Sequence, residues 1–225
     1  MIDVLRCIAI LLLTLSSELH AAVVFDNFGP VDSYQTFGWG LGVVPSSPDT
    51  YVGAAFTPAA AYALETLELP LFRSECVPGL QCTDTVDILF MDSSADGRPN
   101  HVIELFADVM PPIQMSPLES QGSLTLLTST MQPVLLPGQR YWMIVSAGVI
   151  MANWRENSIT ELGPMVQDNV PFNQLSVVYH DDRPAFRVQG SLVPEPAEMM
   201  WSCIGFALLI GRLGNRFKVR RSLPT

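Results

Sequence analysis

The stretch with the most metal-binding potential is DSSADG, residues 92–97. Asp92 and Asp96 supply carboxylates, and the serines supply hydroxyls, so the stretch offers the hard oxygen ligands that Ca²⁺ prefers. Glu68 or Asp26 could complete such a site in space. The stretch lacks the distal glutamate and the full ligand pattern of a calcium-binding loop, and its composition is also typical of a plain hairpin turn. The turn is the favoured interpretation, a calcium site is the alternative, and no other cofactor is predicted.

Tryptophan side chains form the second group that could bind a ligand, because their flat rings can stack on sugar rings. Trp39 lies in a glycine-rich stretch and Trp154 in a polar one. Both are therefore predicted to be exposed in loops and to offer a platform for sugars. Trp142 lies in the apolar stretch YWMIV, where the alternation of side chains along a strand places it in the core.

Two cysteines of the main part of the chain, Cys76 and Cys82, bracket the short segment VPGLQ. In a chain that enters an oxidising compartment this spacing predicts a disulfide that closes a small loop. A metal site is disfavoured, because two thiolates would need histidine or carboxylate partners and no such cluster is near.

Catalytic motifs are absent from the sequence. It contains no H-E-x-x-H, no nucleophile elbow and no phosphate-binding glycine loop. The HDD stretch at 180–182 precedes RPAF and is interpreted as a turn. No catalytic residue is predicted, and the protein is predicted not to be an enzyme. A secreted hydrolase stays an alternative, because the paired carboxylates of glycosidases meet only in space.

The elements that must position these residues read as β-strands. Short apolar or alternating stretches recur between segments rich in Pro, Gly, Ser and Asp. This pattern favours an all-β fold, a jelly-roll-like β-sandwich over residues 23–192. The expected strands cover residues 23–28, 51–57, 63–72, 84–91, 101–108, 122–130, 140–148, 175–180 and 185–192.

The N-terminus, residues 1–22, has the order of a secretory signal peptide: an early arginine, an apolar run, and then polar and small residues. Cleavage is expected near Ala21 or Ala22.

The main part of the chain is strongly acidic. The whole chain has 22 acidic and 12 basic residues. The signal peptide removes Asp3, Glu18 and Arg6, and the C-terminal segment removes two glutamates and five basic residues. The remainder has 18 acidic residues against six arginines, a net charge of −12. This net charge repels nucleic acid and anionic lipid surfaces, and neither is predicted as a partner.

A Pro-Glu-Pro motif stands directly before the last apolar run. The motif comprises Val193, Pro194, Glu195 and Pro196. Proline cannot continue a helix, so we expect this tetrapeptide to be extended and open to a processing enzyme.

The uncharged run after the motif, residues 199–210, would rise about 18 Å as a helix, less than the roughly 30 Å of a hydrocarbon core. We therefore expect a transmembrane helix that continues to about Phe217, with two arginines four residues apart reaching back to the headgroups. The positive-inside preference keeps Lys218, Arg220 and Arg221 in the cytoplasm. The basic tail comprises Arg212, Arg216, Lys218, Arg220 and Arg221.

This order of motif, apolar helix and basic cluster over residues 193–222 resembles the PEP-CTERM protein-sorting signal of Gram-negative bacteria. The resemblance implies that the chain is a substrate of an exosortase, a membrane protease of transpeptidase type, and that it accompanies exopolysaccharide production. The C-terminal domain is accordingly set at residues 193–225.

The main part of the chain is similar to the domain called choice-of-anchor R, which often precedes such signals. That family brings no established molecular activity. The motifs that carry the similarity are VVFDNFGP at 23–30, AAFTPAAAYALETLEL at 54–69, LFMDSSADGRPN at 89–100, LLPGQRYWMIVSAG at 135–148, NW at 153–154 and PAFRVQG at 184–190.

Together these resemblances imply an exported protein that is held at the membrane with its main domain outside the cytoplasm. After processing it would lie at the cell surface or in the extracellular matrix as a structural or adhesive component. The first alternative is a carbohydrate-binding module that uses loop aromatics, with or without calcium.

Overall fold

The computed structural model describes residues 21–42, 50–73, 85–113, 124–147, 152–168, 177–180 and 183–194. The predicted signal peptide up to residue 20, the predicted disulfide of Cys76 and Cys82, and the tail from Glu195 onward lie outside the described residues. Within these residues, no helix has the length and apolar character needed to cross a membrane. Contacts between Cα atoms divide the chain into two units, Met1–Leu192 and Val193–Thr225.

The described residues form an all-β fold, as the sequence predicts. All the strand pairs are antiparallel. The elements are β1 (Ala22–Asp26), η1 (Pro30–Asp32), β2 (Tyr34–Leu41), β3 (Thr50–Phe56), β4 (Tyr62–Leu69), β5 (Leu71–Arg73), β6 (Val86–Ser93), β7 (Pro99–Val109), β8 (Thr125–Thr128), β9 (Val134–Leu135), β10 (Tyr141–Ala147), β11 (Ala152–Asn157), β12 (Gly163–Asp168), β13 (Val177–His180) and β14 (Arg187–Leu192).

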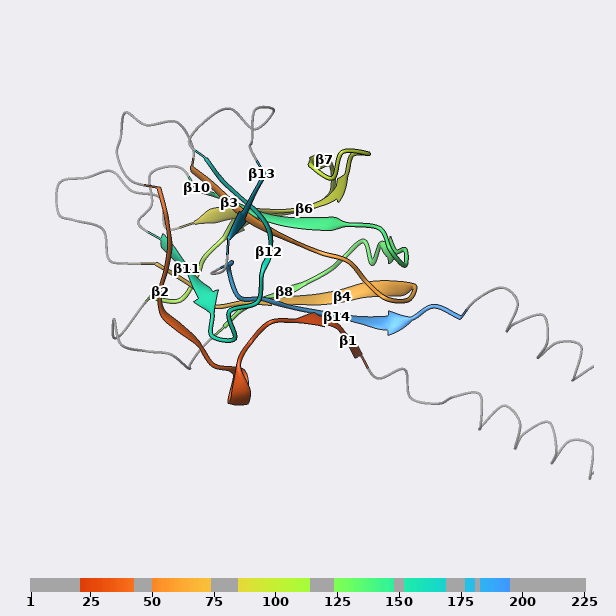
Figure 1. Ribbon diagram of the computed structural model, residues 1–225, viewed down its shortest axis with the longest axis horizontal. Coiled ribbons are helices and arrows are strands. Elements are labelled where there is room, and N and C mark those ends of the chain that lie inside the picture. The colour runs from red at the N-terminus through yellow and green to blue at the C-terminus, as the bar shows by residue number, and fades with distance from the viewer. Residues whose placement is uncertain are drawn as a thin grey trace, which may run out of the picture. The chain divides into compact units, whose positions relative to one another are not determined.

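The strands form three sheets. The five-stranded sheet has the order β1-β14-β4-β8, with β9 also paired to β4. The six-stranded sheet has the order β13-β12-β3-β10-β6-β7, and a smaller sheet has the order β2-β11-β5. In Figure 1 the two larger sheets lie as layers one above the other, so the architecture is sandwich-like.

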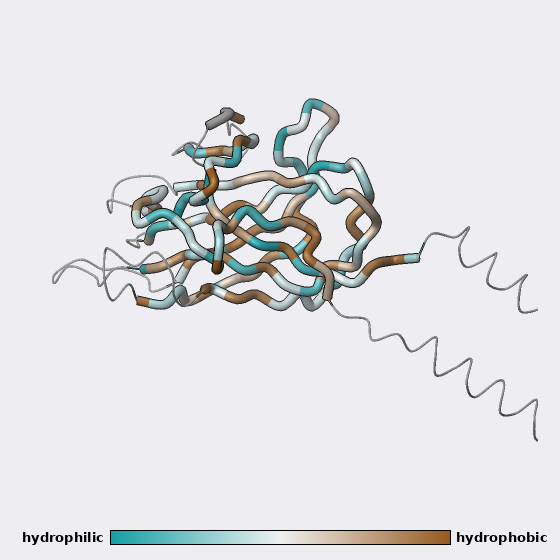
Figure 2. The backbone as a smooth tube through the Cα atoms, turned by 60° about the horizontal axis from the view of Figure 1, so that its bottom comes forward, coloured by the Kyte–Doolittle hydropathy of each residue, from teal (hydrophilic) through white to brown (hydrophobic). Residues whose placement is uncertain are grey.

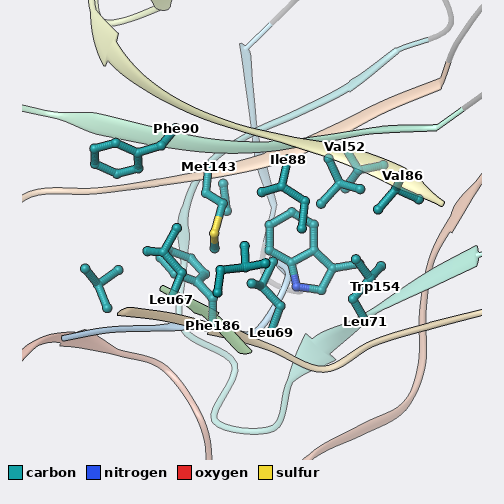
Figure 3. Close-up of a cluster of buried hydrophobic side chains, with 14 of the residues drawn as sticks. Val52, Leu67, Leu69, Leu71, Val86, Ile88, Phe90, Met143, Trp154 and Phe186 are labelled. Atoms are coloured by element: carbon teal, nitrogen blue, oxygen red, sulfur yellow. The ribbon is translucent and has the colours of Figure 1, made fainter. Parts of the chain in front are cut away.

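The main core lies between the two larger sheets. Hydropathy changes repeatedly along single strands (Figure 2), as expected when alternate side chains face the core. Figure 3 shows side chains of the two layers, such as Ile88 and Leu69, pointing toward one another, with the Trp154 ring beside them. All three are fully buried. Burial of this apolar surface is the main force that holds the layers together.

Strand β10 is buried on both faces. Tyr141, Met143 and Val145 belong to the core between the layers, whereas Trp142 and Ile144 belong to a second cluster. The prediction that Trp142 is a core residue is therefore confirmed. Adjacent aromatics can both be buried here because they point to opposite faces of the sheet and each joins an apolar cluster.

Glu104 links the two layers at one edge. It lies on β7, at the edge of the six-stranded sheet, and its carboxylate accepts hydrogen bonds from the turn that follows β8. The donors are the Ser129 hydroxyl at 2.6 Å, the Thr130 amide at 2.7 Å and hydroxyl at 3.1 Å, and the Met131 amide at 3.3 Å. Only 4% of the Glu104 surface is exposed, so these bonds replace the water that burial removes.

The last strand of the domain, β14, lies between β1 and β4. Val188 is opposite Phe25 on one side and Leu67 on the other. Strand β1 begins at Ala22, so the first and last strands of the domain are hydrogen-bonded neighbours. The chain leaves β14 at Leu192, one residue before the Pro-Glu-Pro motif begins at Val193.

Candidate functional site

Two neighbouring clefts lie at one end of the six-stranded sheet, where β3 and β6 end and β7, β10 and β12 begin. The first has a volume of about 580 Å³ and is open to solvent. It is lined by Thr57, residues 93–97 and residues 138–140. The second has a volume of about 250 Å³ and is lined by Phe25, residues 55–57, Arg140, residues 161–164 and Arg183. Thr57 and Arg140 line both clefts, so the two lie side by side at these residues.

The predicted calcium stretch forms the turn of the β6–β7 hairpin and lines the first cleft. Asp92 accepts a hydrogen bond of 2.7 Å from the His101 amide. Asp96 accepts one of 2.5 Å from the Ser94 hydroxyl, which lowers the pKa of Asp96, and pairs with Arg98 at 3.2 Å. The two carboxylates thus have separate partners. Within the part of the chain that the structure describes, no group of three or more His, Cys, Asp or Glu could hold a metal ion.

Two other expected calcium ligands lie elsewhere. Asp26 on β1 and Glu68 on β4 both pair with Arg187 of β14, at 2.8 Å and 3.1 Å. Asp32 is a third partner of the same guanidinium, which also lies over the Phe28 ring at 5.2 Å. The expectation that Asp26 or Glu68 would join the hairpin site is therefore wrong, because cross-strand register brings both to an arginine.

Gly97 holds the hairpin turn in place. Its carbonyl oxygen accepts hydrogen bonds from the Trp142 indole nitrogen at 3.2 Å and from Arg140 Nη1 at 3.3 Å. Its φ angle is +81°, and a Cβ at this position would lie 2.5 Å from Arg140 Nη1. Only glycine adopts this backbone conformation without strain.

We expect Gly97→Ala to destabilise the protein by about 1–2 kcal/mol, because the left-handed conformation is strained in alanine and the new methyl group displaces Arg140. Urea denaturation measures the loss. Gly40→Ala is the matched control: it lies on β2, and a Cβ there would have no heavy atom within 4 Å. The prediction fails if both variants unfold at the same urea concentration.

Arg183 lines the second cleft and is almost completely buried. Only 3% of its surface is exposed. Its Nη1 donates to the Ala55 carbonyl at 3.1 Å, and its Nη2 pairs with Glu161 at 2.6 Å. The guanidinium also lies over the Phe25 ring at 4.8 Å. Its Nε is buried and has no hydrogen-bond acceptor among the described residues.

Arg140 lies where the two clefts meet and is partly buried. It donates a hydrogen bond to the Gly97 carbonyl, and it forms no ion pair with any carboxylate of the described residues. Neither Arg140 nor Arg183 was predicted as a site residue. The available signal was their rarity, since the acidic main domain contains only six arginines.

The predicted tryptophan platform is not formed. Trp154 is fully buried on β11, its indole nitrogen donates to the Ala185 carbonyl at 2.7 Å, and its ring packs edge-on against Phe186. The prediction that Trp154 is exposed is therefore wrong: its polar neighbours are themselves buried, and the stretch is a central strand. Trp39 is directly opposite Trp154 on β2 and is partly buried against the same core.

Comparison with family models, with curated proteins and with solved structures finds no match for this chain. The resemblances to the PEP-CTERM signal and to choice-of-anchor R stay predictions from the motifs.

Proposed function

We propose that the protein is exported and sorted by its C-terminal tail, which an exosortase-type enzyme recognises at the Pro-Glu-Pro motif. The main domain then remains in the cell envelope or the exopolysaccharide as a structural or adhesive component. The order of signal peptide, Pro-Glu-Pro motif, apolar run and basic cluster supports this proposal. The signal peptide, the transmembrane helix and the jelly-roll-like form of the sandwich are parts of the same proposal.

The observation that carries the proposal is the end of β14. The strand ends at Leu192, and Leu192 is still in register with Tyr62 of β4. The motif starts with the next residue. Cleavage at Pro194–Pro196 would thus remove no residue of any described strand and would release the domain intact. A processing site placed inside β14 would instead destroy the five-stranded sheet.

Replacing Pro194 and Glu195 with alanine together is expected to abolish processing, because the extended motif is the feature that the enzyme recognises. The precursor should accumulate in the membrane fraction with its C-terminal tail intact and only the signal peptide removed. Mass spectrometry of the membrane fraction measures this mass. Glu198→Ala changes a charge in the same tail outside the motif and should be processed normally. Normal maturation of the double variant would refute the sorting proposal.

A second candidate function, binding of carbohydrate, is favoured by the clefts at the end of the six-stranded sheet. Their lining includes the hydroxyls of Thr57 and Ser94 and the amide of Gln139, groups that form hydrogen bonds with sugar hydroxyls. The first cleft is in the size range of small-molecule sites. The protein would then adhere to polysaccharide through this end, and we propose no catalytic activity.

A further inference from the structure

We propose that Arg140 and Arg183 make the two clefts a binding site for the carboxylates of an acidic polysaccharide, one built from uronate sugars. The proposal rests on the second proposed function, carbohydrate binding, and names its class of ligand.

When the charged residues that line the clefts are paired, one arginine has no carboxylate partner among them. Asp96 pairs with Arg98, and Glu161 pairs with Arg183. Among the described residues that line the clefts, Arg140 is then the remaining charged group, and it has no acidic partner. In a main domain whose net charge is −12, carboxylates are plentiful. An arginine that stays partly buried without a carboxylate therefore indicates that an external anion supplies one.

Arg183 is fixed in the wall of the second cleft. Its contacts with the Ala55 carbonyl, Glu161 and the Phe25 ring hold the guanidinium plane in place. Both Nη atoms are engaged in these contacts and the Nε is buried. Arg183 therefore shapes the wall of the cleft, and Arg140 supplies the donors for a bound carboxylate.

The other lining groups favour a saccharide over an acidic peptide. The first cleft presents hydroxyls, the Gln139 amide and the backbone of Gly138, and it is open along the surface. The second adds apolar surface from Leu162, which is 65% exposed, and from Pro164. Hydroxyl and amide groups suit the many hydroxyls of sugars, and the apolar surface suits the C–H face of a ring. A chain of several sugars fits two neighbouring clefts that share Thr57 and Arg140 better than a single small anion does.

The test is titration calorimetry on the full-length protein in mild detergent, with a uronate tetrasaccharide as the probe. We expect binding that weakens as salt rises, because ion pairs at an open cleft are screened. Arg140→Gln should lower the affinity about tenfold, and Arg140→Lys should lower it less, because the charge remains while the fork is lost. Glu161→Gln should raise the affinity about threefold, since it removes a competing carboxylate.

Arg73→Gln is the matched control. Arg73 lies on β5, donates to the Pro111 carbonyl at 3.1 Å and lines neither cleft, so its loss should leave the affinity within about twofold. The methyl ester of the tetrasaccharide, which keeps the sugar and removes the charge, should bind about tenfold more weakly. Melting temperatures of all variants establish that each is folded.

The proposal is overturned if the wild type does not bind the uronate probe, or if folded Arg140→Gln binds it equally well. It is also overturned if the methyl ester binds equally, which would leave general carbohydrate binding in place, or if a glutamate tetrapeptide binds better. Asp181 and Asp182 directly precede Arg183 in the sequence. If the uronate probe binds only after both aspartates are replaced by asparagine, the arginines of the clefts pair with carboxylates of the protein itself. That result would also overturn the proposal. Tail processing is read by mass in separate experiments, so its outcome is independent of these.

Discussion

Trp154→Ala is expected to lower the free energy of unfolding by about 4 kcal/mol, because it removes the largest kind of side chain from a fully buried position. The ring belongs to the core between the layers, and its centroid lies 6.3 Å from the centroid of the Phe186 ring. Its indole nitrogen donates a hydrogen bond to the Ala185 carbonyl. The variant therefore loses packing and leaves a buried acceptor unpaired. Trp154 also connects β11 of the small sheet to this core. The variant should therefore weaken the packing of the small sheet against the core as well as the core itself.

Urea denaturation followed by circular dichroism measures this loss. Trp39→Ala is the control, since Trp39 is opposite Trp154 in register but only partly buried; it should cost about half as much or less. Trp154→Phe separates the two contributions, because it keeps a ring and removes the indole donor. A loss below about 1 kcal/mol for Trp154→Ala would contradict the burial of this side chain.

Glu104→Gln is expected to cost about 3 kcal/mol at neutral pH and to change the acid sensitivity of the protein. Burial alone would raise the pKa of Glu104, but the hydrogen bonds from Ser129, Thr130 and Met131 outweigh it and lower the pKa. A lowered pKa in the folded state means that the stabilisation is complete above the unfolded pKa of about 4.3 and is lost as pH falls through the folded value. Glutamine places an NH₂ group against these donors, so the amide cannot replace the carboxylate.

The measurement is the free energy of unfolding of wild type and variant between pH 7 and pH 3. The difference between them should be largest at pH 7 and should shrink as pH falls below the unfolded pKa of about 4.3 toward the lowered folded pKa of Glu104. Glu65→Gln, on the neighbouring sheet, is the control for removal of one acidic charge from an acidic domain. A wild-type–variant difference that stays constant over this pH range would show that the Glu104 carboxylate does not stabilise the fold through its charge.

The alternation of apolar residues predicts most of the strands. The strands and breaks that it does not predict have physical explanations. The stretch 63–72 reads as one strand, but it forms β4 and β5 in different sheets. The break is at Pro70, whose nitrogen cannot donate to a ladder and whose carbonyl instead accepts from the Arg155 amide at 3.0 Å. Proline inside an apolar run was the signal for this break.

Strands β2 and β11 were missed because their composition is atypical of strands. Strand β2 contains Gly38 and Gly40, which the usual propensities disfavour. Gly38 is required there, since a Cβ would lie 2.3 Å from the Trp154 carbonyl oxygen. Strand β11 has the sequence ANWREN, which reads as a polar loop, yet Arg155 and Asn157 are both buried.

Only part of the candidate site could be predicted from the sequence. The hairpin of residues 92–97 was recognised as a turn, and it does line a cleft. The two arginines come from distant segments, and their meeting depends on the order β12-β3-β10-β6 of the six-stranded sheet. Side-chain burial decided the rest: Trp154 reads as an exposed aromatic in a polar stretch, and only the packing of β11 against the core shows otherwise.

The place of β14 between β1 and β4 has a mechanical consequence. A protein tethered by its C-terminus while its other end grips a polymer is loaded through its last strand. Force directed along β14 must shear two ladders of hydrogen bonds together, whereas a strand at the rim of a sheet would peel away one bond at a time. In the proposed membrane-held form, before processing, the tether would thus be attached to a strand that is paired on both sides.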